Sequence, residues 1–459
     1  MRTAPRRTFA LVAASSLFLF LVPAASAHES PGHGLLAAAE KLSLSGGGHA
    51  ARQDGFMVLG HSDLGGGGLN ADVWAHRGYA YVGVWSGTCP ATGVKVADYR
   101  NLIRPRLVST LPNDPGTSAE DVVVRAVNTP AMTGDLAVVG IQTCGDVADP
   151  VFRGLAFFDV TDPRHPAEVG RWAAPEFSVG CHEVDLVARA DGRVLAGCAN
   201  IFAEQINGSG EIVLVDATDP SHPTTVGDWA IGADLGVDPA DNPDNVGCFG
   251  ASFNHSVRFI DDGMGVYGSY WDFGAVLLDI SDPSTPVYLS RADAAPPDED
   301  GDVHSVTTAQ GGRTLITNAE DFSPVECPGE LGLGGWGEVR LFDTADPSAP
   351  ALVGSFSTPN SRSVRDDGFF AVHNTEVAKG AQAFSSWYSD GVVWWDFTDR
   401  AHPRQRGQWV PPAAVDPQGV FPKIPIVWGV HLDRERNLIL ASDINSGLWI
   451  LRPIGLGNF

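Results

Sequence analysis

FFDVTDPRHPAEVGRW, at residues 157–172, leads a hydrophobic strand into a corner rich in Asp and Pro and out into a second strand. The same pattern returns four more times, as LVDATDPSHPTTVGDW (214–229), LLDISDPSTPVYLSR (277–291), LFDTADPSAPALVGSF (341–356) and WWDFTDRAHPRQRGQW (394–409). A degenerate copy, VKVADYRNLIRPRLVSTL (94–111), precedes them. Repetition of one supersecondary unit roughly every 50 residues is typical of a propeller or a solenoid.

The stretch around each corner predicts the sheet of one propeller blade. Residues 255–291 read as a strand, a Gly-bearing turn, a second strand, a loop, a third strand ending at Asp279, the corner and a fourth strand. Four short strands per repeat are the sheet of one blade. Proline is tolerated at the corner because that turn donates no backbone N–H to the sheet, and the preceding Asp can close the turn. The chain is therefore expected to be all-β.

The two ends of the repeat region predict how the ring closes. After the sixth corner, residues 427–453 supply three strands but no fourth. FMVLGHSDL (56–64) resembles the missing strand, and we expect it to pair with GLWIL (447–451), which would remove the open sheet edges. The sequence thus predicts a seven-bladed β-propeller over residues 55–459, closed by its N-terminal strand. Residues 28–54, rich in Gly, Ala and Ser, are expected to form a flexible lead-in.

The corner pattern resembles the LVIVD repeat, a family of exported or surface-located β-propellers. GHSDLGGGG (60–68) and HRGYAYVG (76–83) are similar to the opening of some of its members. The resemblance covers nearly the whole chain after the leader and implies the fold, but it implies little about chemistry. The first and sixth copies depart from the D-x-x-D-P pattern of the other corners.

Residues 1–27 have the features of a secretory signal peptide. A basic start is followed by the apolar run at 9–22 and by Ala25-Ser26-Ala27, a cleavage site of the A-x-A type. The run is too short to span a bilayer comfortably. We therefore expect a protein that is secreted, extracellular or at the cell surface, without membrane insertion.

The net charge of −25 bears on the partners. An acidic surface repels phosphate backbones and anionic headgroups, so the sequence argues against nucleic-acid and lipid partners. Cationic ligands or divalent metals fit an acidic surface better. The expected partner is a cell-envelope or extracellular ligand or protein, and the chain is expected to be a monomer.

The cysteine count predicts disulfides. An even number of cysteines in an oxidising compartment suggests up to three bonds, with the pairing left open. We expect all of them on one face of the propeller, close to the histidines described next. The six are Cys89, Cys144, Cys181, Cys198, Cys248 and Cys327.

Histidine recurs near the start of the first strand in five blades. The first strand of every blade lines the axis of a propeller, so equivalent positions form a ring. The second blade carries Glu120 at this position and the first carries Ala71. Five imidazoles and one carboxylate are thus predicted to converge at one mouth of the channel. The histidines are His182, His255, His304, His373 and His431.

An Asp follows the histidine by 17 residues in three consecutive blades, as Asp272, Asp321 and Asp390. The midpoint of each interval falls at the Gly-bearing turn, so each Asp is expected to face its own histidine across the hairpin.

Two interpretations of the ring remain open. Neutral imidazoles could bind Cu, Zn, Mn or Fe while the carboxylates orient the rings, or His and Asp could form a hydrogen bond that only stabilises each blade. The acidic loops at 237–245 and 296–303 could hold Ca²⁺, although neither has the spacing of a dedicated calcium loop. The first functional hypothesis is an exported binding or interaction protein with a metal-binding axial face. The alternative is a metal-dependent enzyme, an oxidase or a polysaccharide lyase, that uses the same ring.

Overall fold

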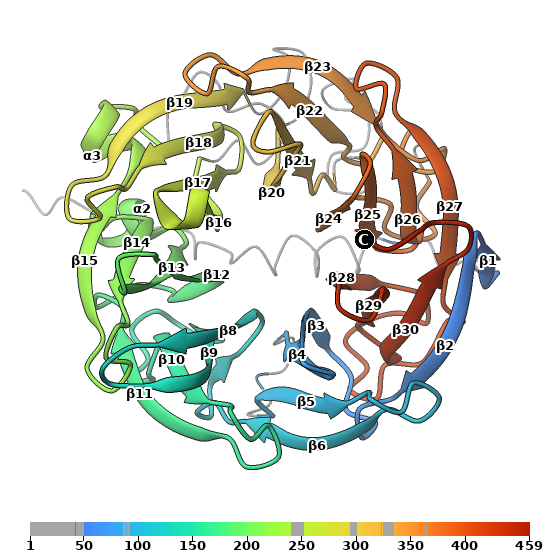
Figure 1. The fold of residues 1–459 in the computed structure, drawn as a ribbon, viewed down its shortest axis with the longest axis horizontal. Helices are drawn as coiled ribbons and strands as arrows, with labels where there is room; N and C mark the ends of the chain where they lie inside the picture. Colours follow the sequence, from blue (N-terminus) through green and yellow to red (C-terminus); the bar gives the residue numbers. More distant parts are fainter. Residues whose placement is uncertain are drawn as a thin grey trace, which may run out of the picture.

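The computed structural model describes residues 42, 50–85, 89, 92–239, 252–293, 301–322, 324, 335–363 and 365–459. These residues form seven antiparallel sheets around one central axis, as Figure 1 shows. The chain is thus an all-β seven-bladed propeller, and the predicted fold class is confirmed. The predicted signal peptide (1–27) lies outside the described residues, and so do most residues of the predicted lead-in.

Each blade runs from the axis outward in chain order. Blade 1 consists of β3 (Asn70–His76), β4 (Tyr79–Val84), β5 (Val94–Asp98) and β6 (Arg106–Leu111). Blade 2 consists of β7 (Thr117–Ser118), β8 (Val122–Asn128), β9 (Thr133–Thr143), β10 (Gly154–Asp159) and β11 (Ala167–Ala173). Blade 3 consists of β12 (Cys181–Ala188), β13 (Val194–Asn200), β14 (Ile212–Asp216) and β15 (Thr224–Trp229). Blades 4 and 5 consist of β16 (Asn254–Ile260), β17 (Gly265–Tyr270), β18 (Gly274–Asp279) and β19 (Val287–Asp293), and of β20 (Val303–Ala309), β21 (Thr314–Ala319), β22 (Val339–Asp343) and β23 (Ala351–Phe356). Blade 6 consists of β24 (Thr375–Ala378), β25 (Gln382–Trp387), β26 (Gly391–Asp396) and β27 (Arg404–Val410), and blade 7 of β28 (Val427–Asp433), β29 (Leu438–Asp443) and β30 (Gly447–Pro453).

The N-terminal strands complete the last two blades. β2 (Phe56–Ser62) pairs with β30 as the fourth strand of blade 7, in a register that places Phe56 opposite Pro453 and Ser62 opposite Leu448. This is the closure predicted from the sequence. β1 (Arg52–Asp54) pairs with the outer edge of β27, so the strands begin three residues before the expected start of the propeller.

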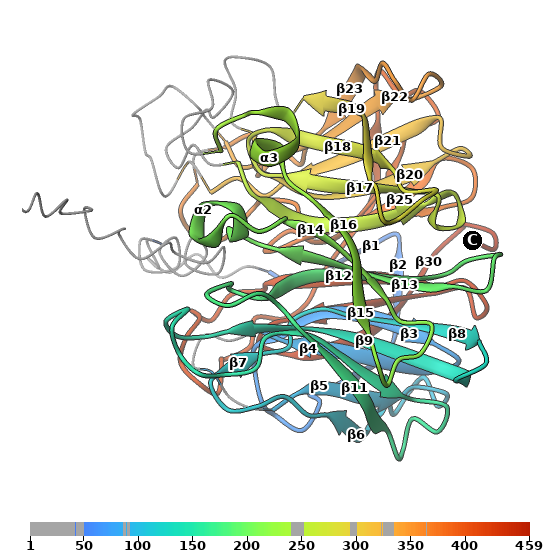
Figure 2. The same cartoon turned by 90° about the vertical axis from the view of Figure 1, so that its left-hand side faces the viewer.

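The helical segments that lie wholly within the described residues are short: α2 (Ala203–Asn207), α3 (Ile231–Leu235) and the 3-10 turn η1 (Asp261–Gly263). α2 and α3 lie on the face of the disc where the innermost strands begin, at the left of Figure 2. No helix in the described part of the chain is long and apolar enough to cross a membrane.

The Asp that ends each third strand closes the corner, as the sequence predicts. Its Oδ1 accepts a hydrogen bond of 2.8–3.1 Å from the backbone N–H two residues later in all six corners. Such a bond fixes the turn without help from the sheet. The residues are Asp98, Asp159, Asp216, Asp279, Asp343 and Asp396.

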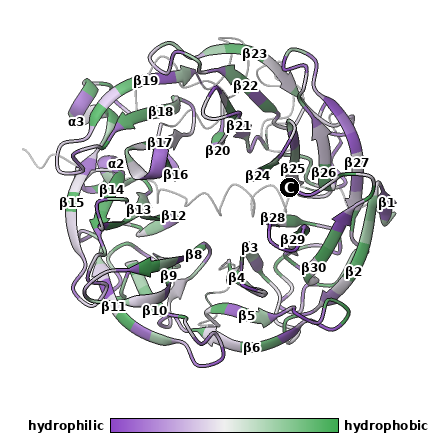
Figure 3. Ribbon diagram, in the orientation of Figure 1, coloured by the Kyte–Doolittle hydropathy of each residue, from purple (hydrophilic) through white to green (hydrophobic). Residues whose placement is uncertain are grey.

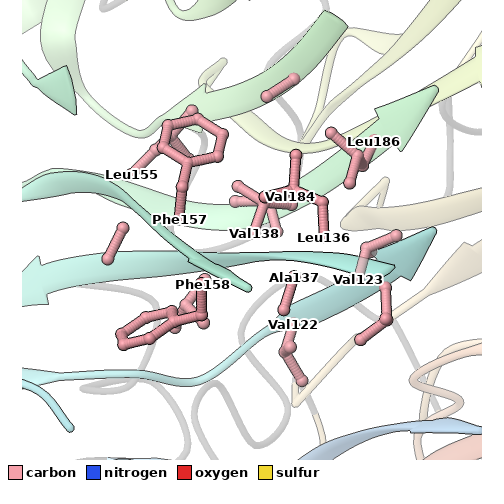
Figure 4. Close-up of a cluster of buried hydrophobic side chains, with 14 of the residues drawn as sticks. Val122, Val123, Leu136, Ala137, Val138, Leu155, Phe157, Phe158, Val184 and Leu186 are labelled. Carbon is pink, nitrogen blue, oxygen red and sulfur yellow. The ribbon is translucent and has the colours of Figure 1, made fainter. Parts of the chain in front are cut away.

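The hydrophobic core lies between neighbouring blades. Hydrophobic residues lie on strands all around the ring, as the colouring of Figure 3 shows. Phe157 and Val138 of blade 2 pack in one cluster with Val184 and Leu186 of blade 3, which Figure 4 shows. Burial of this kind on both faces of each sheet stabilises the stack of blades.

A close backbone contact joins the fourth strand of one blade to the corner of the next. In blades 2, 3 and 5 the strand carries glycine at this point, and an added Cβ would lie within 2.2 Å of a carbonyl oxygen. At the distance found in these three blades glycine is needed, because a Cβ would overlap the neighbouring backbone. The pairs are Gly170 with Pro220, Gly227 with Pro283, and Gly354 with Arg400.

Blades 1 and 4 carry serine instead of glycine at the same contact. Ser109 Oγ donates to the carbonyl oxygen of Pro163 at 2.5 Å, and Ser290 Oγ donates to that of Pro347 at 2.6 Å. The corner carbonyl oxygen therefore either accepts a hydrogen bond from a serine hydroxyl or lies directly against the Cα of a glycine.

The same contact continues across the closure. Gly407 of blade 6 lies against the carbonyl of Asp54, directly before β2, and Gly60 of β2 lies against the carbonyl of Leu102 in the corner of blade 1. The N-terminal segment thus takes the place of the corner that blade 7 lacks.

One disulfide joins the first two strands of blade 3, between Cys181 and Cys198. Cys181 directly precedes His182, so this bond lies on the histidine side, as predicted. Cys89 and Cys144 are free, whereas Cys248 and Cys327 lie outside the described residues.

Removal of β2 is expected to destabilise the whole ring. Deletion of residues 1–64 leaves β30 with an unpaired outer edge, so the melting temperature should fall well below that of a chain lacking only residues 1–50. Thermal unfolding of the two truncated proteins measures the difference. Equal melting temperatures would contradict the closure by β2.

A methyl group at the blade-to-blade contact is also expected to destabilise the protein. Gly227→Ala places a Cβ against the carbonyl of Pro283, so we expect a loss of about 1–3 kcal/mol in unfolding free energy, as for other overpacked sites. Gly457→Ala is the control, because an added Cβ there meets no atom within 4 Å. Urea unfolding of both variants tests the prediction, and a stability of Gly227→Ala equal to that of the control would refute it.

Candidate metal centre

Four imidazoles from consecutive blades meet on the axis, where the innermost strands begin. They belong to His182 in β12, His255 in β16, His304 in β20 and His373 just before β24. A β-bulge interrupts the register at the histidine in β12, β16 and β20. Bulges re-aim side chains, which accounts for rings that point inward at this depth. All four residues are no more than 3 % exposed.

The four rings follow one another along an arc. Nε2 of His182 lies 2.9 Å from Nε2 of His255. The ring centres of His255 and His304 are 4.2 Å apart, and those of His304 and His373 are 3.9 Å apart. The sequence prediction that these four histidines converge is therefore supported by the geometry.

Carboxylates alternate with the imidazoles. Glu120 Oε2 lies 3.2 Å from Nδ1 of His182, and Glu183 Oε1 lies 3.3 Å from Nε2 of His304. Glu320 Oε2 lies 3.9 Å from the same Nε2 atom. Two further acid–imidazole approaches of 3.9 Å join Glu183 to His255 and Asp72 to His373. Asp72, Glu120, Glu183 and Glu320 thus lie around the histidine arc.

Many of these polar atoms lack a hydrogen-bond partner within the described part of the chain. They are Nδ1 of His182, His255 and His373, both ring nitrogens of His304, Oε1 of Glu183 and Oδ2 of Asp72. A buried polar atom without a partner costs roughly 1–3 kcal/mol. Together these atoms offer electron pairs that a metal ion could accept.

Burial determines the charge state of the rings. It holds the pKa of His255, His304 and His373 well below the usual value, and the neighbouring imidazoles lower it further. The rings are therefore neutral at physiological pH, which is the form that binds metals.

Burial acts on the acids in the opposite direction. It raises the pKa of Asp72 and Glu183 well above the usual value, and the other carboxylates of the site raise it further. Burial and the neighbouring acids therefore favour the protonated, neutral form of these two carboxyl groups.

Three groups of residues bring three ligand atoms each within 4.8 Å of one another, which is close enough to hold a metal ion. The groups are Glu183–His255–His304, His304–Glu320–His373 and Asp72–Glu120–His373. Nitrogen and carboxylate oxygen in such sets suit Zn, Cu, Mn or Fe.

The three aspartates expected to orient the rings have other partners. Asp390 accepts hydrogen bonds from Thr358, Asn360 and Gln408. Asp272 accepts one of 3.3 Å from the backbone N–H of Asp302. Asp321 is half-buried next to Glu320. The carboxylates that lie 3.2–3.9 Å from the imidazoles belong to other residues than the three predicted aspartates.

His431 lies outside the group of four. β28 has the same bulged register as β16 and β20, and this register places Trp428, not His431, at the position of His255 and His304. The sequence alignment was displaced by three residues because Val430-His431 resembles Val303-His304. His431 Nδ1 instead accepts the backbone N–H of Ala75 at 3.2 Å, and burial lowers its pKa to about 4.

Three of the four acids at the site were not predicted from the sequence. Asp72 and Glu183 directly follow Ala71 and His182, and Asp121 likewise follows Glu120. An acid immediately after the predicted ring position in the first three blades was the available signal. Glu320 follows β21 and had no comparable pattern.

A small chamber adjoins the acids on the side away from the first-strand starts. It has a volume of about 70 Å³ and is lined by Asp72, Asp121 and Glu183 at one end and by Arg258, Glu376 and His431 at the other. A cavity of about 1060 Å³ on the opposite face of the disc shares Arg258 and Glu376 with this axial chamber. The chamber thus has room for a few water molecules or a small ligand beside the metal-binding groups.

Comparison with known protein families agrees with the architecture. Residues 67–88 and 266–293 match the family model described as the LVIVD repeat. The first segment includes strands β3 and β4, and the second includes β18 and the corner of blade 4. No curated protein matches the chain. The chain is therefore a seven-bladed β-propeller in which two segments match the LVIVD-repeat model.

Proposed function

We propose that the protein is an exported binding protein that holds a transition metal on the propeller axis, through His182, His255, His304 and His373. The observation that supports this most directly is the set of buried ring nitrogens and carboxylate oxygens without hydrogen-bond partners. The leader-like residues 1–27 support export.

The same observation favours a metal site over a purely structural ring. A stabilising His–Asp hydrogen bond would occupy the ring nitrogens, yet both nitrogens of His304 lack such a bond. Metal coordination would use these electron pairs and would require the neutral rings that burial produces.

The donor chemistry narrows the choice of metal. Imidazole nitrogen suits Zn, Cu, Mn and Fe, whereas Ca²⁺ prefers an all-oxygen shell. Carboxylates beside Nδ1, as Glu120 is beside His182, would orient the rings toward the ion. The two acidic loops considered for Ca²⁺ fall largely outside the described residues.

A metal-dependent oxidase is the second candidate, and the axial chamber favours it. A catalytic metal keeps a coordination position for water or substrate, and the chamber lies beside Asp72 and Glu183. Only a small molecule fits a volume of about 70 Å³. A polysaccharide chain could not reach histidines that are at most 3 % exposed, so the lyase alternative is disfavoured.

Ion pairs lie between the chamber and the larger cavity. Arg258 and Arg434 both approach Glu376, at 3.5 and 3.7 Å, where the chamber meets the larger cavity. A small substrate would enter from this face, past the ion pairs.

Replacement of the central histidine tests the metal proposal. We expect wild-type protein recovered from the culture medium to carry a transition metal, and His304→Ala to carry clearly less of it because His304 belongs to two of the three ligand groups. His431→Ala is the matched control and should keep its metal. Elemental analysis of the three proteins gives the answer, and wild-type protein without metal after supply of Zn, Cu, Mn and Fe would overturn the proposal.

Addition of a small exogenous ligand distinguishes the oxidase from a closed binding site. Azide added to the Cu²⁺-loaded protein should shift its absorption and electron paramagnetic resonance spectra if an open position faces the chamber. Unchanged spectra at saturating azide would indicate that protein ligands fill the coordination sphere. Metal binding without catalysis would then be the remaining proposal.

A further inference from the structure

Two of the three ligand groups share no residue. Glu183, His255 and His304 form one group, and Asp72, Glu120 and His373 form the other. We refer to them as set one and set two. A single metal ion needs only one such group of ligands. A site with one ion therefore does not explain the second set.

Two further residues link the sets. Glu320 groups with His304 of set one and His373 of set two. His182 lies between Glu120 of set two, 3.2 Å from its Nδ1, and His255 of set one, 2.9 Å from its Nε2. The two sets thus lie side by side on the axis with a shared group at each junction.

The number of donors exceeds what one ion uses. Four imidazoles and four carboxylates converge here, whereas a transition metal of this type commonly takes four to six ligands. Eight residues, some of them bridging, are a suitable number for two ions.

The charge of the site also favours two ions over one. Carboxylates bind metal as anions, so the four acids bring four negative charges, while the four imidazoles bring none. The salt bridges of Asp72, Glu120 and Glu183 within the described residues are all with histidine, not with Arg or Lys. One divalent ion would leave a buried excess of negative charge, and two would offset it.

We propose that the axis holds two metal ions, one on set one and one on set two, with Glu320 and His182 at the junctions. This inference rests on the proposed metal-binding function and specifies its stoichiometry. Paired ions that share carboxylates lie about 3.5–4 Å apart in known two-metal sites.

Metal counting on the full-length protein tests the pair. We expect about two ions per chain after equilibration with excess Zn²⁺ or Mn²⁺ and removal of unbound metal. One ion per chain at saturation would overturn the pair but leave the single-ion function intact. No ion would contradict the proposed function itself, so the two failures are distinguishable.

Matched substitutions assign the ions to their sets. Glu183→Gln alters set one only and Glu120→Gln alters set two only, and both changes preserve the shape of the side chain. Each variant should retain about one ion, and the double variant should retain almost none, whereas His431→Ala should still hold two. Loss of all metal from either single variant would contradict independent sets.

Spin counting on the Cu²⁺-loaded wild type gives a test that needs no variant. Two Cu²⁺ ions within about 4 Å couple magnetically. The integrated paramagnetic signal should therefore fall well below the copper content of the wild type and approach it in Glu120→Gln. A wild-type signal equal to the copper content would exclude a coupled pair.

Discussion

The approach of each fourth strand to the backbone of the next blade is the contact on which this propeller depends. Gly170, Gly227 and Gly354 allow the corner carbonyl to come within a distance that no side chain permits, and Ser109 and Ser290 bind it through a hydroxyl. Because the contact recurs around the ring, it fixes the spacing between neighbouring sheets. That spacing brings the first strands close enough for side chains of different blades to touch on the axis.

The chemistry of the axis follows from this convergence. Residues far apart in the chain, such as Asp72 and His373, come within 3.9 Å because each begins an innermost strand. Water is largely excluded there, so neutral imidazoles and raised carboxyl pKa values result from burial itself. The proposed metal ions would satisfy the ring nitrogens without hydrogen-bond partners and would offset the charge of the acids. Stability and metal binding are therefore expected to be coupled in this protein.

The fold was accessible from sequence because its signal is repeated. Each corner was predicted from its Asp and Pro residues, and the closure from a missing strand and a spare one; both predictions are confirmed. The site was accessible only in part. His182, His255, His304 and His373 were aligned correctly, but the β-bulges that set their depth leave no mark in the sequence, so His431 was misplaced. Asp72 and Glu183 were missed because pairing across a hairpin was assumed, whereas their contacts with the histidines run between blades.

The pairing of β2 with β30 sets the order in which the molecule can be completed. Phe56 and Pro453 lie opposite each other although nearly the whole chain separates them, so β2 emerges from the ribosome first and its partner last. Contacts of such long sequence separation form slowly, because the entropy of closing a large loop opposes them. Until then, both strands present unpaired edges to other chains. A newly made chain therefore passes through a long interval in which protection from aggregation must come from outside the fold.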